Sequence, residues 1–295
     1  MQGLLLINKP EGITSFGAVA KIKWLLHTNR AGHTGTLDPM ATGVLPILVG
    51  RDTVLSSHLL DADKEYIADV KLGITTDTLD KTGTVLSKSD VNISKEELET
   101  VLKGFLGKQK QVPPMYSALK KDGVRLYDLA REGKEIVREP REIEIFELEL
   151  LAFLGDEFKI RVLCSKGTYI RSLADDIGKK LGTGATLTAL KRTKTAGFKI
   201  EECVDLEDLT PENTATFLKS AENAVLNYPF LTVSEKQALR FSNGGELSLE
   251  RLHFKSEPKN GEIYRVKNGD RFFGLGEVDY EKSALKIKCL TITRD

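Results

Sequence analysis

An isolated carboxylate in a glycine-rich loop is the first feature with chemical potential. Asp38 lies in residues 30–46, RAGHTGTLDPMATGVLP, and the nearest other carboxylate in the sequence is Asp52. A glycosidase uses two carboxylates, so Asp38 has no such partner by proximity, although a residue distant in the sequence can still complete a pair. A lone Asp-Pro step is most often a turn. The residues alone therefore leave Asp38 open as a turn residue or a catalytic acid.

Four further side chains have useful chemistry, but each also has an ordinary structural interpretation. Arg171, in KGTYIRS at the start of an expected helix, is by type more often surface charge. Tyr169 in the same segment fits a core or rim position, and Tyr66 in KEYIADV fits a half-buried strand position. His33 fits a loop histidine with local hydrogen bonds. Residue type alone identifies none of these positions as functional.

The cysteines and histidines give no sign of a metal centre. No two cysteines share the spacing of a zinc ribbon or a thioredoxin-like motif, and no HxxxH or HxH pattern occurs. We therefore expect no metal and a reducing compartment. These residues are Cys164, Cys203 and Cys289 with His27, His33, His58 and His253.

Residues 31–46, AGHTGTLDPMATGVLP, are similar to the signature of the TruB family, the tRNA pseudouridine-55 synthases. Four other segments resemble that family's conserved blocks in the same order, and together the five cover the first domain. They are INKPEGITS (7–15), DKEYIADVKLGITTDTLDKTG (63–83), VPPMYSALKKDGVRLYDLAREG (112–133) and CSKGTYIRSLADDIGKKLG (164–182).

The resemblance implies an isomerase that uses no cofactor. Such an enzyme breaks the bond from ribose C1′ to uracil N1 and rebuilds it to C5. The resemblance implies that Asp38 is the essential catalytic carboxylate, acting by attack on C6, by attack on C1′ or by deprotonation at C2′; the residues leave these routes open. Each route requires ionised Asp38. The resemblance also implies that Arg171 pairs with Asp38 and favours its charged form.

The resemblance assigns further side chains to the neighbourhood of the base. It implies that Tyr169 lies beside the base as a candidate for proton transfer at C5, and that Tyr66 stacks on the extruded uracil. His33 would occupy the space that the base leaves. Leu190 would pack near the base, and Lys9 would brace the catalytic loop. We therefore expect Tyr66, His33, Leu190 and Lys9 within the substrate-binding site.

The formal net charge is zero, from 43 basic and 43 acidic residues, but the charges are unevenly distributed. Residues 101–141 hold ten Lys or Arg against five acids, and residues 158–199 hold ten against two. Solvated surface charge is one explanation, and a positive face for a polyanion is the other. Because residues 112–133 resemble the family's RNA-gripping insertion, we expect phosphates of the tRNA T-arm to contact Lys120, Lys121 and Lys166. Other basic residues expected near the RNA are Arg125, Arg131, Lys134, Lys191 and Arg192.

Alternating and periodic patterns predict the elements that hold these residues. We expect strands at 3–10, 44–50 and 64–73, with a long loop before the second of these. We expect a helix at 15–27 capped by Ser15, another at 97–107 with a Ser94 and Glu97 capping box, and a third at 169–182 stopped by Gly182. Residues 141–153 and 157–165 read as a hairpin. This order favours an α+β fold with a mixed, largely antiparallel sheet over a repeated βαβ fold.

A change of character near residue 229 predicts two domains. Residues 1–228 would form the catalytic domain, with short helices over 205–225. Residues 229–295 would form a small PUA-like, RNA-binding β-barrel, because short strands at 244–254, 261–270, 271–280 and 285–293 are separated by Gly and Asn-Gly turns. An oligomerisation or stabilising module remains an alternative for this region.

The composition, 40% hydrophobic and 29% charged over 295 residues, is that of a globular protein. No apolar run approaches the roughly 18 residues of a membrane helix, and the start has no basic lead or cleavage site. We expect a monomer in the cytoplasm with no membrane partner.

Two other functions remain in competition with tRNA pseudouridine synthesis. A tRNA-folding chaperone would open and re-form the T-arm without needing Asp38, and such an activity is also expected beside the enzymatic one. A carboxylate-dependent glycosidase of small nucleosides would need no long basic stretches. Turnover of a T-arm stem-loop against free uridine, and the effect of Asp38→Asn, separate the three.

Overall fold

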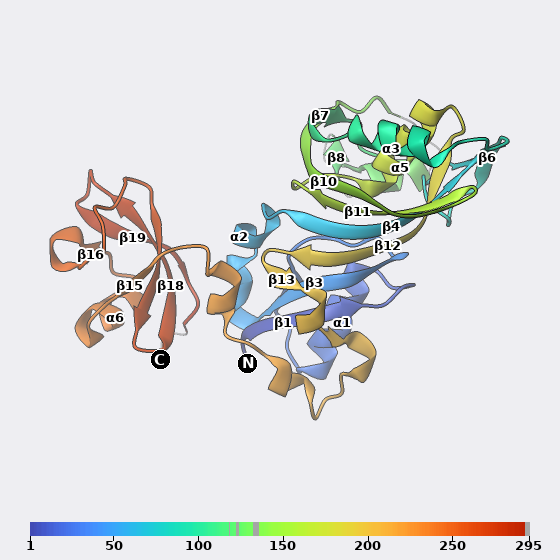
Figure 1. Ribbon diagram of the computed structural model, residues 1–295. Coiled ribbons are helices and arrows are strands. Elements are labelled where there is room, and N and C mark those ends of the chain that lie inside the picture. The colour runs from blue at the N-terminus through green and yellow to red at the C-terminus, as the bar shows by residue number, and fades with distance from the viewer. Residues whose placement is uncertain (118, 122–123, 132–135, 293–295) are drawn as a thin grey trace.

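The computed structural model describes residues 1–117, 119–121, 124–131 and 136–292. Its main feature is a ten-stranded sheet with the order β14-β1-β3-β12-β4-β11-β10-β7, to which β2 and β13 add at β3 and β12 (Figure 1). Among the described strands of this sheet only the β1–β14 and β3–β12 pairs are parallel, so the prediction of a mixed, largely antiparallel sheet is confirmed. The strands are β1 (Gly3–Lys9), β2 (Ala31–His33), β3 (Ala41–Val49), β4 (Lys64–Leu72), β7 (Gly107–Gln111), β10 (Arg141–Leu154), β11 (Glu157–Cys164), β12 (Ala185–Thr195), β13 (Phe198–Lys199) and β14 (Val204–Asp205).

Helices cover the two halves of this sheet separately. Helix α1 (Ser15–Leu25) lies beside β1 and β3, whereas α3 (Lys95–Lys103) and α5 (Ile170–Leu181) lie over the half formed by β4, β11 and β10 (Figure 1). Gly178 lets α5 approach β12 closely, because a Cβ at this position would lie 2.3 Å from the Ala185 nitrogen. The remaining elements here are α2 (Ser57–Leu60), α4 (Leu126–Arg131), the hairpins β5 (Ile74–Thr76) with β6 (Val85–Lys88) and β8 (Lys120–Lys121) with β9 (Val124–Arg125), and the 3₁₀ helices η1 (Gly50–Leu55), η2 (Ile200–Glu202), η3 (Leu206–Asp208), η4 (Thr214–Phe217) and η5 (Ala221–Val225).

The helix boundaries show where the local sequence was sufficient to predict the start or end of a helix. The capping box of Ser94 and Glu97 is present at α3, and α5 ends at Gly182 in the left-handed conformation, as predicted. The predicted cap of α1 was wrong by one residue, since Thr14 accepts from the Gly17 nitrogen at 2.9 Å. The Ser15 hydroxyl is instead buried against the catalytic loop, a contact between segments that are not adjacent in the sequence.

The C-terminal region contains a second, smaller sheet, which lies to one side of the first (Figure 1). Its five strands are ordered β15-β17-β18-β19-β16, which agrees with the small PUA-like fold expected here. The strand predicted at 244–254 was largely wrong, because only Leu247–Ser248 pair as β16 before the 3₁₀ helix η6 (Leu249–Arg251). The prediction also missed α6 (Glu235–Ser242). The other strands are β15 (Phe230–Thr232), β17 (Ile263–Asn268), β18 (Arg271–Asp279) and β19 (Ala284–Leu290).

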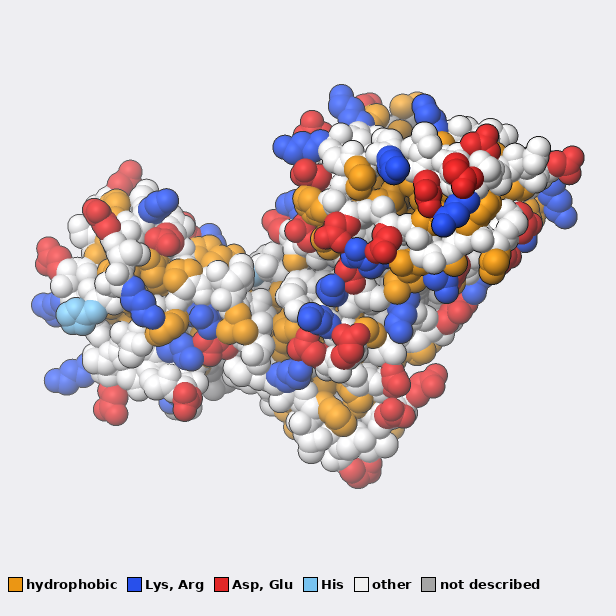
Figure 2. All heavy atoms as spheres, in the orientation of Figure 1, with side chains coloured by type: hydrophobic (Ala, Val, Ile, Leu, Met, Phe, Trp, Pro, Cys, Tyr) orange, Lys and Arg blue, Asp and Glu red, His pale blue; other side chains and the backbone are white. Residues whose placement is uncertain are grey.

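One apolar cluster joins the two sheets. Leu55 and Leu59 from the first part of the chain pack in the same cluster as Leu275 of β18. Over the face shown in Figure 2, basic and acidic side chains are interspersed on both lobes. None of the helices within the described residues has the length and apolar character that a membrane crossing requires.

Candidate active site

Asp38 lies in the loop between β2 and β3, and this loop is fixed by α1 and the turn before it. The Ser15 hydroxyl donates to the Leu37 carbonyl at 3.0 Å and accepts from the Leu37 nitrogen at 2.8 Å. The Gly12 nitrogen donates to the Pro39 carbonyl at 2.8 Å. The residues on both sides of Asp38 are therefore held, which limits the positions open to its carboxylate.

Lys9 braces the same loop from beneath. Its ammonium donates to the carbonyls of Pro10 at 2.7 Å, Ile13 at 2.8 Å and Pro39 at 3.4 Å. Burial lowers the pKa of Lys9 to about 8. Lys9 is 0% exposed, which agrees with the expected bracing role, while its place among the substrate-binding residues stays a prediction. Its ammonium donates its hydrogen bonds to backbone carbonyls inside the fold.

Arg192 of β12 was misplaced by the sequence reasoning, which put it near RNA phosphates. It is 0% exposed, and its guanidinium donates to the carbonyls of Val44 at 2.8 Å, Gly35 at 3.1 Å and Thr36 at 3.5 Å. The alternation along the strand could have predicted this burial. Arg192 follows Leu190 by two residues, so both side chains face the same side of the sheet. Arg192 therefore supports the catalytic loop from within.

The predicted ion pair of Asp38 and Arg171 is present. Arg171 Nε lies 2.8 Å from Asp38 Oδ2, and the side chains are 5% and 35% exposed respectively. The other guanidinium nitrogens donate to the Thr78 carbonyl at 3.0 Å and the Tyr116 carbonyl at 2.8 Å. Arg171 is thus held on every side, while the carboxylate keeps an open side.

Asp80 is a second carboxylate at this guanidinium, and the sequence reasoning missed it. Asp80 Oδ2 lies 3.6 Å from Arg171 Nη1, and the side chain is buried. Asp80 Oδ1 accepts from the Thr78 hydroxyl at 2.8 Å and the Thr82 nitrogen at 2.9 Å. The signal was available, since Asp80 lies in the DTLDKTG part of a segment that resembles a family block. The guanidinium therefore lies between two carboxylates.

The ionisation of Asp38 reflects opposing effects. Burial raises the pKa of Asp38, the Arg171 guanidinium opposes that rise, and the charge of Asp80 adds to it. The raised pKa brings protonation of this carboxyl closer to neutral pH than for an exposed aspartate. Arg171 is consequently the main group that keeps the carboxylate charged.

Two tyrosines and a leucine lie around this pair. Tyr66 of β4 and Leu190 of β12 are 7% and 8% exposed and belong to one apolar cluster. Tyr169 is half-buried at the N-cap of α5, two residues before Arg171. Burial raises the pKa of both phenols, and the nearby Asp38 carboxylate raises them further, so both are neutral at pH 7. The structure thus brings these predicted residues together.

His33 ends β2 at the start of the catalytic loop and is half-buried. Its Nδ1 accepts from the Gly35 nitrogen at 3.4 Å. Burial lowers the pKa of His33, and the charge of Arg192 lowers it further. The imidazole is therefore neutral at pH 7.

Of the lysines expected to bind RNA, Lys166 and Lys191 are described, and both are exposed. Lys166 is exposed and its ammonium lies 2.8 Å from Asp61. Lys191 is exposed on β12. Lys134 and the side chains of Lys120, Lys121, Arg125 and Arg131 lie outside the part of the chain that the structure describes.

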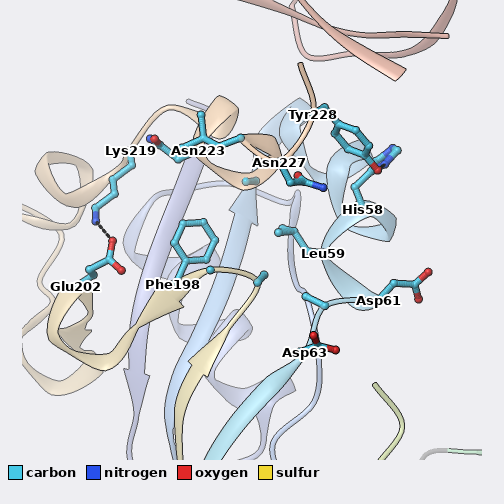
Figure 3. Close-up of a pocket in the computed structure, with 15 residues that line it drawn as sticks. His58, Leu59, Asp61, Asp63, Phe198, Glu202, Lys219, Asn223, Asn227 and Tyr228 are labelled. Atoms are coloured by element: carbon cyan, nitrogen blue, oxygen red, sulfur yellow. Dashed lines mark hydrogen bonds and ion pairs between the residues drawn. The ribbon is translucent and has the colours of Figure 1, made fainter. Parts of the chain in front are cut away.

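A cavity of about 780 Å³ opens elsewhere, at the junction of the two sheets (Figure 3). His58 Nδ1 lies 3.0 Å from the Tyr228 hydroxyl on one side of it, and Lys219 pairs with Glu202 on the other. Asp61 and Asp63 also line it, and this excess of carboxylates disfavours a phosphate ligand. None of the predicted site residues lines this cavity. Within the described residues, no group of three or more His, Cys, Asp or Glu is arranged to hold a metal ion.

Comparison with known proteins agrees with this geometry. Residues 23–170 match the model of the TruB family pseudouridylate synthase N-terminal domain, and residues 171–226 match that of the tRNA pseudouridylate synthase B C-terminal domain. The tRNA pseudouridine synthase B of Pseudomonas fluorescens is 45% identical over 285 residues, 94% of this chain and 92% of that protein. The enzyme of the same name from Francisella philomiragia is 47% identical over 287 residues, 96% and 93% of the two chains.

A solved structure extends the likeness to three dimensions. A chain in the crystal structure of a Cbf5-Nop10-Gar1 complex is 28% identical, with a TM-score of 0.76, over 99% of this chain and 86% of that one. The match therefore includes both sheets. With its family models, its relatives and its fold in agreement, this chain belongs to the TruB family of pseudouridylate synthases.

Proposed function

We propose that this protein is a tRNA pseudouridine synthase that isomerises the T-loop uridine at position 55, with Asp38 as its catalytic carboxylate. The observation that carries the proposal is the pair of Asp38 and the buried Arg171, which lies next to Tyr66 and Tyr169. The names of the two relatives, both tRNA pseudouridine synthase B, support the reaction and the substrate.

The reaction conserves the atoms of the nucleotide. The bond from C1′ to N1 breaks, a bond from C1′ to C5 forms, a proton leaves C5 and N1 ends protonated. Ionised Asp38 serves as nucleophile or base in each of the three routes, and the open side of its carboxylate faces the ribose or base. Tyr169 takes part in the C5 proton transfer: its neutral phenol accepts the C5 proton as it passes its own to solvent, from which N1 is protonated.

The uridine must leave its stack in the T-loop to reach Asp38. Tyr66 offers an aromatic face to the extruded uracil, and packing has already fixed its ring, so little side-chain entropy is lost on binding. Leu190 packs beside it. Neutral His33 fills the space that the base vacates, where an uncharged ring suits stacking among bases.

Basic side chains and the C-terminal region bind the RNA outside the catalytic site. Residues 1–228 form the catalytic domain, and residues 229–295 form a PUA-like RNA-binding domain. Lys120, Lys121 and Lys166 contact phosphates of the T-arm. The enzyme acts as a cytoplasmic monomer without metal or cofactor. Sedimentation at working concentration would check that it is a monomer, and assays after chelation would check that it needs no metal.

The decisive experiment incubates the protein with an unmodified T-arm transcript and maps pseudouridine by position. Wild type should convert the T-loop uridine, whereas Asp38→Asn should bind the transcript with unchanged affinity and form no product. Asp90→Asn, which changes an exposed aspartate elsewhere, is the matched control. Product formation by Asp38→Asn would refute the assignment of Asp38. Binding and refolding of RNA without any product from wild type would favour a chaperone, and equal turnover of free uridine a nucleoside glycosidase.

A further inference from the structure

A buried glutamine at the end of β7 pairs with the backbone of Tyr169. Gln111 is 4% exposed. Its Nε2 donates to the Tyr169 carbonyl at 3.0 Å, and its Oε1 accepts from the Tyr169 nitrogen at 2.8 Å. The side-chain amide thus binds both polar groups of one residue's backbone, as an adjacent strand would. Two bonds of this kind fix the orientation of that backbone, which a single bond does not.

This pairing lies at the start of a helix that has no conventional side-chain cap. Tyr169 is the N-cap of α5, and its own side chain makes no capping hydrogen bond. Helix starts leave backbone N–H groups without intrahelical partners. Gln111, from a different element, accepts from the one on Tyr169 and also binds the Tyr169 carbonyl. The directions in which Tyr169 and Arg171 leave the first turn therefore depend on β7.

The chain that follows Gln111 remains in contact with the same turn. The Ser172 hydroxyl donates to the Val112 carbonyl at 3.0 Å, and Arg171 Nη2 donates to the Tyr116 carbonyl at 2.8 Å. Three residues at the start of α5 are thus tied to one short segment. Gln111 begins that segment. Among the described residues, no other side chain is hydrogen-bonded to the backbone nitrogen and carbonyl of Tyr169.

We propose that Gln111 is a positioning residue for the isomerisation: its paired hydrogen bonds hold Tyr169 and Arg171 in the geometry that Asp38 and the uracil require. The inference rests on the proposed function and deepens it. Gln111 does not touch the substrate, so its loss should slow the chemical step and leave RNA binding unchanged. A displacement of about 1 Å at a reacting group can cost about a hundredfold in rate.

The test measures single-turnover pseudouridine formation at saturating T-arm transcript, together with the Kd of the transcript, from pH 6 to pH 8.5. Gln111→Leu removes both hydrogen bonds at similar volume. It should slow the step by about ten- to a hundredfold at every pH and keep the Kd within about threefold. Gln109→Leu is the matched control, since Gln109 is half-buried on the same face of β7 and donates to the Phe105 carbonyl rather than to α5.

Gln111→Glu gives a readout that a merely structural role does not produce. The ionised carboxylate still accepts from the Tyr169 nitrogen but repels the Tyr169 carbonyl, whereas the protonated acid can donate to it. Burial raises the pKa of such a carboxyl toward the tested range, so protonation increases as the pH falls. The rate of this variant relative to wild type should therefore rise as the pH falls, and that ratio cancels the titration of Asp38.

The outcomes separate the two proposals. An inactive wild type would overturn the proposed function and the role of Gln111 with it. An active wild type with Gln111→Leu at the same rate, or with the Gln109→Leu control equally slow, would overturn the role of Gln111 alone. So would a Gln111→Glu rate ratio that does not change with pH, a measurement that remains decisive if Gln111→Leu fails to fold.

Discussion

At the scale of single residues, the site depends on the way one guanidinium is shared. Arg171 Nε pairs with Asp38, and the other two guanidinium nitrogens donate hydrogen bonds to the carbonyls of Thr78 and Tyr116. An ammonium at this position has no planar fork and cannot reach all three acceptors in these directions. The charge of Asp38 and the position of Arg171 are therefore set by the same contacts.

Removing the guanidinium should affect catalysis far more than binding. In Arg171→Ala, Asp38 loses the opposite charge that favours its ionised form, and Asp80 keeps its own charge nearby. We expect single-turnover pseudouridine formation to fall by about a hundredfold or more, with the Kd for a T-arm transcript nearly unchanged. Arg251→Ala, at an exposed arginine, serves as control. Equal losses in rate and in affinity would count against the ion pair.

The acid side of the pH-rate profile reports the titration of Asp38. Since burial raises the pKa of Asp38 above 3.8, its carboxylate takes up a proton, and activity is lost, at a higher pH than for an exposed aspartate. Single-turnover rates measured downward from pH 8 should fall with a midpoint above the ordinary value. Because Arg171 opposes the rise, Arg171→Ala should move the midpoint further up. A midpoint at or below the ordinary value of roughly 4 contradicts this account.

At the scale of elements, the sheet and α5 place the chemistry while a separate segment is expected to hold the RNA. The loop of Asp38 is fixed by Ser15, Lys9 and Arg192, which are buried and all bind backbone carbonyls. The basic residues at 120–134, which we expect to bind RNA, follow Tyr116 in the chain. Catalysis and RNA binding should therefore respond to different substitutions.

Replacing Lys120 and Lys121 together by Ala should weaken T-arm binding and flatten its dependence on salt. Each phosphate contact releases counterions, so losing two should reduce the slope of log Kd against log salt by about 1 to 2. The rate at saturating RNA should stay close to that of wild type. Lys88→Ala, at an exposed lysine of β6 outside the segments expected to bind RNA, is the control. An unchanged Kd and slope would place Lys120 and Lys121 away from the RNA.

At the scale of the whole molecule, a buried acid lies where the two sheets meet. Asp52 of η1 is 2% exposed, and among the described residues its Oδ1 has no hydrogen-bond partner. Burial raises the pKa of Cys289 in β19, and an ionised Asp52 would raise it further, so the two lie close together across the junction. Burial raises the pKa of Asp52 to about 7. The native fold therefore prefers this carboxyl protonated.

Stability should fall with rising pH because of Asp52. The folded protein keeps this proton up to about pH 7, while the unfolded chain releases it near 3.8, so the stabilisation is complete below 3.8 and is lost as the pH rises to about 7. Asp52→Asn should raise the Tm relative to wild type at pH 8 by about 2 to 4 °C per kcal/mol regained, with a smaller gain at pH 5. A gain that is equal at both pH values would mean that Asp52 is not the titrating group.

The sequence by itself determined the family and the principal elements. Local patterns were enough for the hairpin of β10 and β11, the capping box of α3 and the glycine stop of α5, because each depends on residues close together in the chain. The motif around Asp38 likewise predicted the pairing with Arg171. For α6 and η6, short segments packed against the small sheet, the sequence pattern misled.

Only the tertiary structure decided which polar groups are used inside the protein. Arg192 looks like a surface charge in the sequence, yet backbone carbonyls from distant segments converge on it, and the Pro39 carbonyl reaches Lys9 in the same way. Asp80 reaches Arg171 and Gln111 reaches Tyr169 through the same long-range packing. A side chain's type states what it can bind, whereas the groups that meet it depend on how strands and helices far apart in the chain are brought together.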